Sequence, residues 1–166
     1  MTRRALQVVL YLWLYLGWFA CVLLGKYGFG IASLIVPAIG WILFWRALSP
    51  ARRDVLKILL LCLGGIAADA AFLHIGVIHD PQGSPLPLWL ASLWLLFAPA
   101  IYIFAGVFGS RFWLAALAGG IMGPLSYKSG EYFGVLEMPG AEGVLIYAVF
   151  WTCFLPLALA WVRKAS

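Results

Sequence analysis

Charged side chains are scarce in this sequence. They make up 10% of its 166 residues, whereas a soluble domain carries about a quarter. Hydrophobic residues make up 65%, and the mean hydropathy is +1.02. A water-soluble fold cannot hide so much apolar surface in its core. The composition therefore excludes a soluble protein and indicates an integral membrane protein.

Cysteine is rare, and the motifs of common enzyme classes are missing. No C-x-x-C pair, serine-hydrolase elbow, H-E-x-x-H helix, P-loop or dinucleotide fingerprint occurs. His74, His79 and Asp80 follow no standard metal spacing, so we interpret them as solvated residues of a link. We expect no metal, no cofactor and no disulfide, since every cysteine falls inside an apolar segment: Cys21, Cys62 and Cys153. The lack of a nucleophile–base motif favours a protein without enzymatic activity.

Short polar links divide the chain into six apolar segments. A helix needs about 20 residues to cross the hydrocarbon core. The sequence predicts an all-α polytopic bundle of six transmembrane helices, forming one domain over residues 1–166, with helices at 5–24, 29–45, 55–75, 88–107, 112–135 and 143–162. No small-x-small site closes the first segment, so we interpret it as an uncleaved signal anchor.

Basic residues fall on alternate sides of these segments. With the N-terminus inside, the outer links contain Lys26 alone. The inner segments contain nine basic residues: Arg3, Arg4, Arg46, Arg52, Arg53, Lys57, Arg111, Arg163 and Lys164. Because lysine and arginine concentrate in cytoplasmic loops, both termini are predicted to be cytoplasmic. The same rule accounts for the net charge of +5, and we expect no nucleic-acid partner.

The fifth segment combines small residues with a proline. Gly119, Gly123 and Gly130 fall on one narrow arc at 100° per residue. Small residues allow two helix backbones to approach closely, so this arc is predicted to be a helix-packing face. Pro124 is predicted to kink the helix. We expect segment 112–135 to lie at the centre of the bundle.

Ionisable residues inside the apolar segments form the candidate polar site. Asp69 in the third segment and Lys128 in the fifth lie at similar depths, with Tyr127 and Glu131 near Lys128. An intramembrane charge is costly, so Asp69 and Lys128 are predicted to meet. Their pair is either a functional site or a structural ion pair between helices. The alternative is that Lys128 extends its amino group to the outer interface.

Three motifs in this order resemble a bacterial inner-membrane family. They are Asp69, the Pro-Leu-Trp-Leu-x-x-Leu-Trp at 87–94 and the Gly-Pro-Leu-Ser-Tyr-x-x-Gly at 123–130. The family is catalogued as domain of unknown function 2878, and the resemblance covers nearly the whole chain. It implies a small polytopic protein of the inner membrane of a Gram-negative bacterium. It also implies genes near those for fatty-acid modification and oxidative-stress responses, but it names no reaction.

Three functions follow from these observations. The first is an accessory protein that binds membrane lipid or a partner membrane enzyme and supports the modification or maintenance of acyl chains. The second is a small transporter or flippase in which Asp69 and Lys128 line a path. The third is a membrane-embedded enzyme that modifies lipid. The sequence leaves the oligomeric state open.

Overall fold

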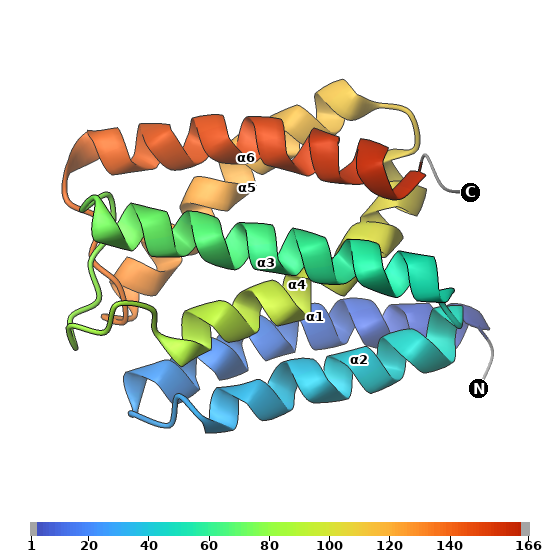
Figure 1. Ribbon diagram of the computed structural model, residues 1–166, viewed down its shortest axis with the longest axis horizontal. Coiled ribbons are helices and arrows are strands. Elements are labelled where there is room, and N and C mark those ends of the chain that lie inside the picture. The colour runs from blue at the N-terminus through green and yellow to red at the C-terminus, as the bar shows by residue number, and fades with distance from the viewer. Residues whose placement is uncertain (1–2, 164–166) are drawn as a thin grey trace.

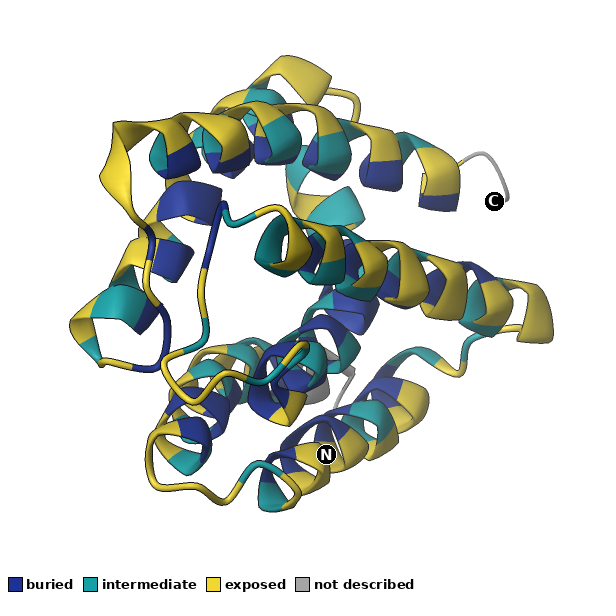
Figure 2. Cartoon of the chain, turned by 60° about the vertical axis from the view of Figure 1, so that its left-hand side comes forward, coloured by how far each residue is buried: buried dark blue, intermediate teal, exposed yellow. Residues whose placement is uncertain are grey.

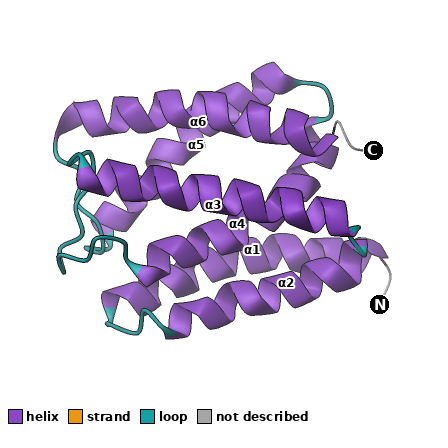
Figure 3. Cartoon of the chain, in the orientation of Figure 1, coloured by secondary structure: helices purple, strands orange, loops and turns teal. Residues whose placement is uncertain are grey.

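The computed structural model describes residues 3–163, and their secondary structure is almost entirely helical (Figures 1 and 3). Lys164 lies outside the described residues, as do the side chains of Arg3 and Arg4. The described chain forms α1 (Arg3–Lys26), the 3-10 helix η1 (Ala32–Leu34), α2 (Ile35–Leu48), α3 (Arg52–His74), α4 (Leu88–Phe108), α5 (Phe112–Tyr132) and α6 (Gly140–Arg163). The helices run side by side, and α1 begins at the end of the bundle where α6 finishes (Figure 1).

Within the described chain, four helices are long and apolar enough to cross a membrane: α1, α3, α4 and α6. The helix formed by α2 with its 3-10 turn is apolar but shorter, at residues 32–48. Helix α5 has 21 residues but carries several glycines together with Lys128 and Glu131. The all-helical prediction is therefore confirmed, together with helices of membrane-spanning length and composition.

Helix α5 ends three residues before the predicted boundary at 135. Gly134 adopts φ +74°, a left-handed conformation that glycine adopts without strain. The Val135 N–H then bonds to the Gly130 carbonyl at 3.1 Å, and the Gly134 N–H bonds to the Glu131 carbonyl at 2.9 Å. This is a Schellman C-cap, which satisfies carbonyls that the helix end leaves free. Apolar residues continue past the cap, so hydropathy alone overestimates the length of the helix.

Helix α4 lies at the centre of the bundle and contacts each of the other five α-helices. More than half of its membrane-length window is buried, at 56%. The prediction that segment 112–135 occupies the centre is wrong, because α5 packs mainly against α6 at the periphery. Figure 2 shows the resulting pattern, in which buried residues face inwards and exposed ones cover the outer faces of the helices.

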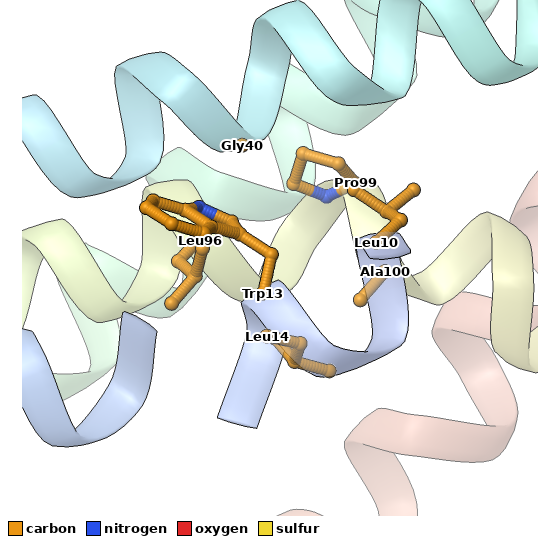
Figure 4. Close-up of a pocket in the computed structure, with 7 residues that line it drawn as sticks. All are labelled: Leu10, Trp13, Leu14, Gly40, Leu96, Pro99 and Ala100. Carbon is orange, nitrogen blue, oxygen red and sulfur yellow. The ribbon is translucent and has the colours of Figure 1, made fainter. Parts of the chain in front are cut away.

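Two of the helix prolines have their freed carbonyls satisfied by neighbouring side chains. Pro99 cannot donate to the Leu95 carbonyl, and the Trp41 indole N–H of α2 bonds to that oxygen at 3.0 Å. Near Pro99, helices α1, α2 and α4 leave a cavity of only about 10 Å³ (Figure 4). The Ser33 carbonyl, four residues before Pro37, accepts a hydrogen bond from the Cys21 thiol at 3.8 Å. Side-chain donors thus stabilise the interrupted helices.

Polar contacts connect the helices at both ends of the bundle. At one end, the 76–87 and 133–139 links pair through His79 and Glu137, which exchange two backbone hydrogen bonds of 2.8 Å. At the other end, the Lys57 ammonium of α3 donates to the Trp161 carbonyl in the last turn of α6 at 3.0 Å. A cation at this position also interacts favourably with the helix dipole. These contacts hold α3, α5 and α6 in fixed register.

Candidate functional site

The candidate site is built around Asp69, whose side chain is fully buried in α3. Three other helices each contribute one polar aromatic side chain at the same depth: Trp94 from α4, Tyr127 from α5 and Tyr147 from α6. Counted from the bundle end that carries the 76–87 link, the four residues lie five to seven positions into their helices. At 1.5 Å per residue this corresponds to roughly 8–10 Å.

Three donors converge on the Asp69 carboxyl group. The Trp94 indole N–H donates to Oδ2 at 2.7 Å, and the Tyr147 hydroxyl donates to Oδ1 at 2.9 Å. The Tyr127 hydroxyl lies 2.8 Å from Oδ1 and 2.9 Å from Oδ2. An ionised carboxylate only accepts hydrogen bonds, so this set of donors matches its requirement. The cluster joins α3, α4, α5 and α6 through one side chain.

Aromatic packing positions these donors. The Trp94 indole stacks on Trp151 of α6 with centroids 5.3 Å apart and planes 2° apart. The Tyr127 and Tyr147 rings lie against each other with centroids 3.8 Å apart. A methyl group added to Gly65 of α3 would lie 2.1 Å from the Trp94 ring. Glycine at position 65 therefore brings α3 and α4 close enough for the indole to reach Asp69.

A large apolar cavity adjoins this cluster. Its volume is about 670 Å³, and α1, α4, α5 and α6 all contribute to its wall. Trp94 and Tyr127, which hold Asp69, form part of that wall, together with Phe97 of α4 and Trp151 of α6. None of the lining side chains is acidic, basic or histidine. The volume falls within the range of about 300–1,000 Å³ that is typical of ligand sites.

The cavity faces the space between α1 and α5. These two helices do not pack along their length in the described chain, where α5 packs on α6 and α1 on α2 and α4. Near the 76–87 end, Phe133 contacts the rings of Trp18 and Phe19 at 6.3 and 6.1 Å between centroids. This contact closes one end of the opening between α1 and α5. Elsewhere the cavity is lined by exposed side chains of both helices, among them Phe19 of α1 and Met122 of α5.

The predicted contact between Asp69 and Lys128 is wrong. Lys128 is paired with Glu131 one turn further along α5, and both side chains are partly exposed. Glu131 also accepts a hydrogen bond from the Met138 N–H at 3.2 Å. Along a helix, the next residue points 100° away. Tyr127, rather than its neighbour Lys128, therefore faces Asp69.

The glycines of α5 lie where helix α6 crosses it. A methyl group added at Gly119 would lie 2.3 Å from the Trp151 carbonyl, and one added at Gly123 would lie 2.2 Å from the Trp151 ring. Gly120, which the sequence did not single out, is as close to Thr152 at 2.3 Å. Gly130 is buried but leaves ordinary room, with Leu136 at 3.6 Å. Gly119, Gly120 and Gly123 therefore form the close approach between the two helices.

Comparison with known proteins identifies the family. The family model described as "Protein of unknown function (DUF2878)" matches residues 7–157. The chain belongs to this family. The match includes all four residues of the Asp69 cluster and every residue that lines the large cavity of this DUF2878 protein. No curated protein and no solved structure gives a significant match.

Sequence reasoning found Asp69 and Tyr127 of this DUF2878 protein but missed Trp94 and Tyr147. A comparison of the depth of Asp69 with the depths of all tyrosine and tryptophan residues, and not only of charged residues, would have found them. Both occur at the same distance from the 76–87 end as Asp69. In the described part of the chain, no group of three histidine, cysteine, aspartate or glutamate residues lies close enough to hold a metal ion.

Proposed function

We propose that this protein binds the hydrocarbon chain of a membrane lipid and supports the modification or maintenance of membrane acyl chains as an accessory protein. The single observation that carries the proposal is the cavity of about 670 Å³, which has an apolar and aromatic wall. The Asp69 carboxyl group already accepts three hydrogen bonds. Its role in the proposal is to hold α4, α5 and α6, three of the helices that line the cavity, in place from α3.

The proposal places the protein in the inner membrane of a bacterium, with six spans and both termini in the cytoplasm. The positions of the basic residues support this orientation. Arg46, Arg52, Arg111 and Arg163 all belong to helix ends or links on the side where α1 begins and α6 ends (Figure 1). Four helices of membrane-spanning length and composition, α1, α3, α4 and α6, support the placement in a membrane.

The ligand reaches the cavity from the membrane rather than from water. The accessible side of the cavity lies between α1 and α5, and the outer surfaces of these helices are apolar at Tyr15, Phe19, Leu117 and Ile121. The cavity wall offers no charged side chain to a phosphate or carboxylate. A lipid would therefore insert its chain between α1 and α5 and leave its headgroup outside the cavity.

Photocrosslinking tests the proposal. The purified protein is placed in vesicles that contain a phospholipid with a diazirine in the middle of one acyl chain, and labelled peptides are mapped by mass spectrometry. We expect labelling of Phe97, which lines the cavity, in addition to the lipid-facing Leu117. Ala118 lines the cavity, so the larger side chain of Ala118→Phe should occupy part of its volume, exclude the acyl chain and abolish the Phe97 label.

Leu117→Phe is the matched control, because residue 117 is adjacent in α5 but exposed. This variant should retain the Phe97 label at the native level. Labelling confined to lipid-facing residues in the native protein would refute lipid binding in the cavity. Equal loss of the label in both variants would also refute it, because the effect would then not depend on cavity volume.

A further inference from the structure

The wall of the large cavity is unusually rich in aromatic side chains. Ten of its 24 lining residues are phenylalanine, tyrosine or tryptophan, against 16% of the whole chain. The Trp94 and Trp151 indoles stack with planes 2° apart, and the Phe97 ring meets Trp151 edge to face at 5.2 Å. Aromatic faces and edges are complementary to other planar π systems in stacked or T-shaped arrangements. A flexible saturated chain does not require such a wall.

One donor in this wall lacks a partner. Among the described residues, the Trp151 indole N–H is the one buried side-chain polar atom with no hydrogen-bond acceptor. Buried donors in proteins are nearly always paired, so an unpaired one calls for an explanation. Trp151 itself lines the cavity. The indole nitrogen is itself closed off from the cavity, so the Trp151 ring has to turn before the oxygen of a ligand can supply the missing partner.

The depth of Trp151 restricts the ligand. It lies eleven residues after Gly140 and twelve before Arg163, in the middle of α6. The ester carbonyls of a phospholipid lie near the membrane interface, roughly 15 Å from the midplane of a 30 Å hydrocarbon core. They do not reach this level while the headgroup stays in water. A free carboxylate is excluded as well, because no cationic side chain lines the cavity.

We infer that the natural ligand is an uncharged lipid with a planar, carbonyl-bearing ring, of the chemical class of the isoprenoid quinones. Its ring meets the edge of the Trp151 indole, where one carbonyl oxygen lies in the indole plane and accepts the N–H, and its hydrocarbon tail leaves between α1 and α5. The inference rests on the proposed function, because it names the class of lipid that occupies the same cavity. It involves binding only and requires no redox step.

Tryptophan fluorescence tests this inference, since a quinone bound beside indoles quenches their emission. The probe is a benzoquinone with a decyl tail, titrated into the purified protein in vesicles. We expect saturable quenching in the native protein and in Leu117→Phe, and none beyond simple partitioning in Ala118→Phe. Trp151→Phe keeps an aromatic ring and eight of the nine tryptophans. It should raise the Kd about fivefold to tenfold, the loss expected for one hydrogen bond.

The outcomes separate the inference from the proposed function. If the diazirine lipid labels Phe97 but the quinone quenches the native protein and Ala118→Phe equally, the quinone assignment is overturned and lipid binding stands. An unchanged Kd in Trp151→Phe, with normal labelling by the diazirine lipid, overturns the role of the indole as the donor. If neither probe responds to Ala118→Phe, both proposals fail.

Discussion

Replacement of Asp69 tests whether its hydrogen bonds to three other helices stabilise the fold. Asp69→Leu leaves three buried donors without an acceptor. At about 1–3 kcal/mol for each unsatisfied donor, the cost is roughly 3–9 kcal/mol. This is comparable to the whole stability of a typical domain, about 5–15 kcal/mol. We expect Asp69→Leu to fail to accumulate in the membrane.

Asp69→Asn should be milder, because its amide keeps one oxygen. The Trp94 indole can only donate, so it orients the amide oxygen towards itself. The amide nitrogen then faces the Tyr147 hydroxyl and donates to its oxygen, so the Tyr147 proton loses its hydrogen bond to the carboxylate. Loss of one hydrogen bond to a charged group costs about 1.5–3 kcal/mol. The free energy of unfolding, measured by SDS titration in mixed micelles, should fall by this amount.

A double-mutant cycle tests the geometry. Tyr147→Phe alone should cost about 1.5–3 kcal/mol, because it removes a donor to the carboxylate. In the Asp69→Asn background the same change should cost less, about 0.5–1.5 kcal/mol, because it then removes a hydrogen bond between neutral groups instead of one to a carboxylate. The control is Tyr102→Phe, whose hydroxyl donates to Asp54 at 2.9 Å near the opposite end of α4. Its effect should add to that of Asp69→Asn. Additive losses for Tyr147→Phe, or an Asp69→Leu protein as stable as Asp69→Asn, would contradict the reasoning.

Three further predictions concern packing and topology. Gly65→Ala should destabilise the protein by more than about 2 kcal/mol in the same titration, because its methyl group overlaps the Trp94 indole ring. The control is Gly64→Ala, whose methyl group meets open space. It should be neutral or stabilising by up to about 1 kcal/mol. Trp41→Phe should cost about 1–2 kcal/mol by removing the donor to the carbonyl that Pro99 frees, and much less when combined with Pro99→Ala, which restores the helical N–H. A similar loss in both backgrounds would show that the indole acts through packing alone. Reporters fused after successive helices should alternate between cytoplasm and exterior, starting in the cytoplasm; the fusion sites follow Ser49, Gly83, Ser110, Gly140 and Ser166. An external reporter at the last site would exclude the proposed orientation.

Much of the fold could be predicted because its signals are local. Helix 88–107 was expected within one residue of the observed α4, since Pro87 precedes it and Gly109 follows it. The family was identified from the motifs around Trp94 and Tyr127 and is confirmed by the match over 7–157. The six-span topology and the cytoplasmic termini stay predictions, because they rest on the positions of basic residues in the sequence.

The candidate site was predicted only in part. Asp69 was singled out because a carboxyl group in an apolar helix requires partners. Its partners were expected to be charged, but two tyrosines and a tryptophan take that role. Neutral donors satisfy a carboxylate without a second buried charge, so the cluster avoids the desolvation cost of an ammonium group. Tryptophan and tyrosine in an apolar helix look like ordinary packing residues in a sequence, and this explains why two of them were missed.

The sequence by itself determined the class of this protein and the positions of its helices. Apolar runs, prolines and glycines act within one or two turns of the chain, so their effect does not depend on distant residues. Only the tertiary structure decided how each helix is rotated. A difference of one residue turns a side chain by 100°, which places Tyr127 on Asp69 and leaves Lys128 at the surface with Glu131. The cavity is likewise a tertiary property, because it forms where α5 packs on α6 and not along α1.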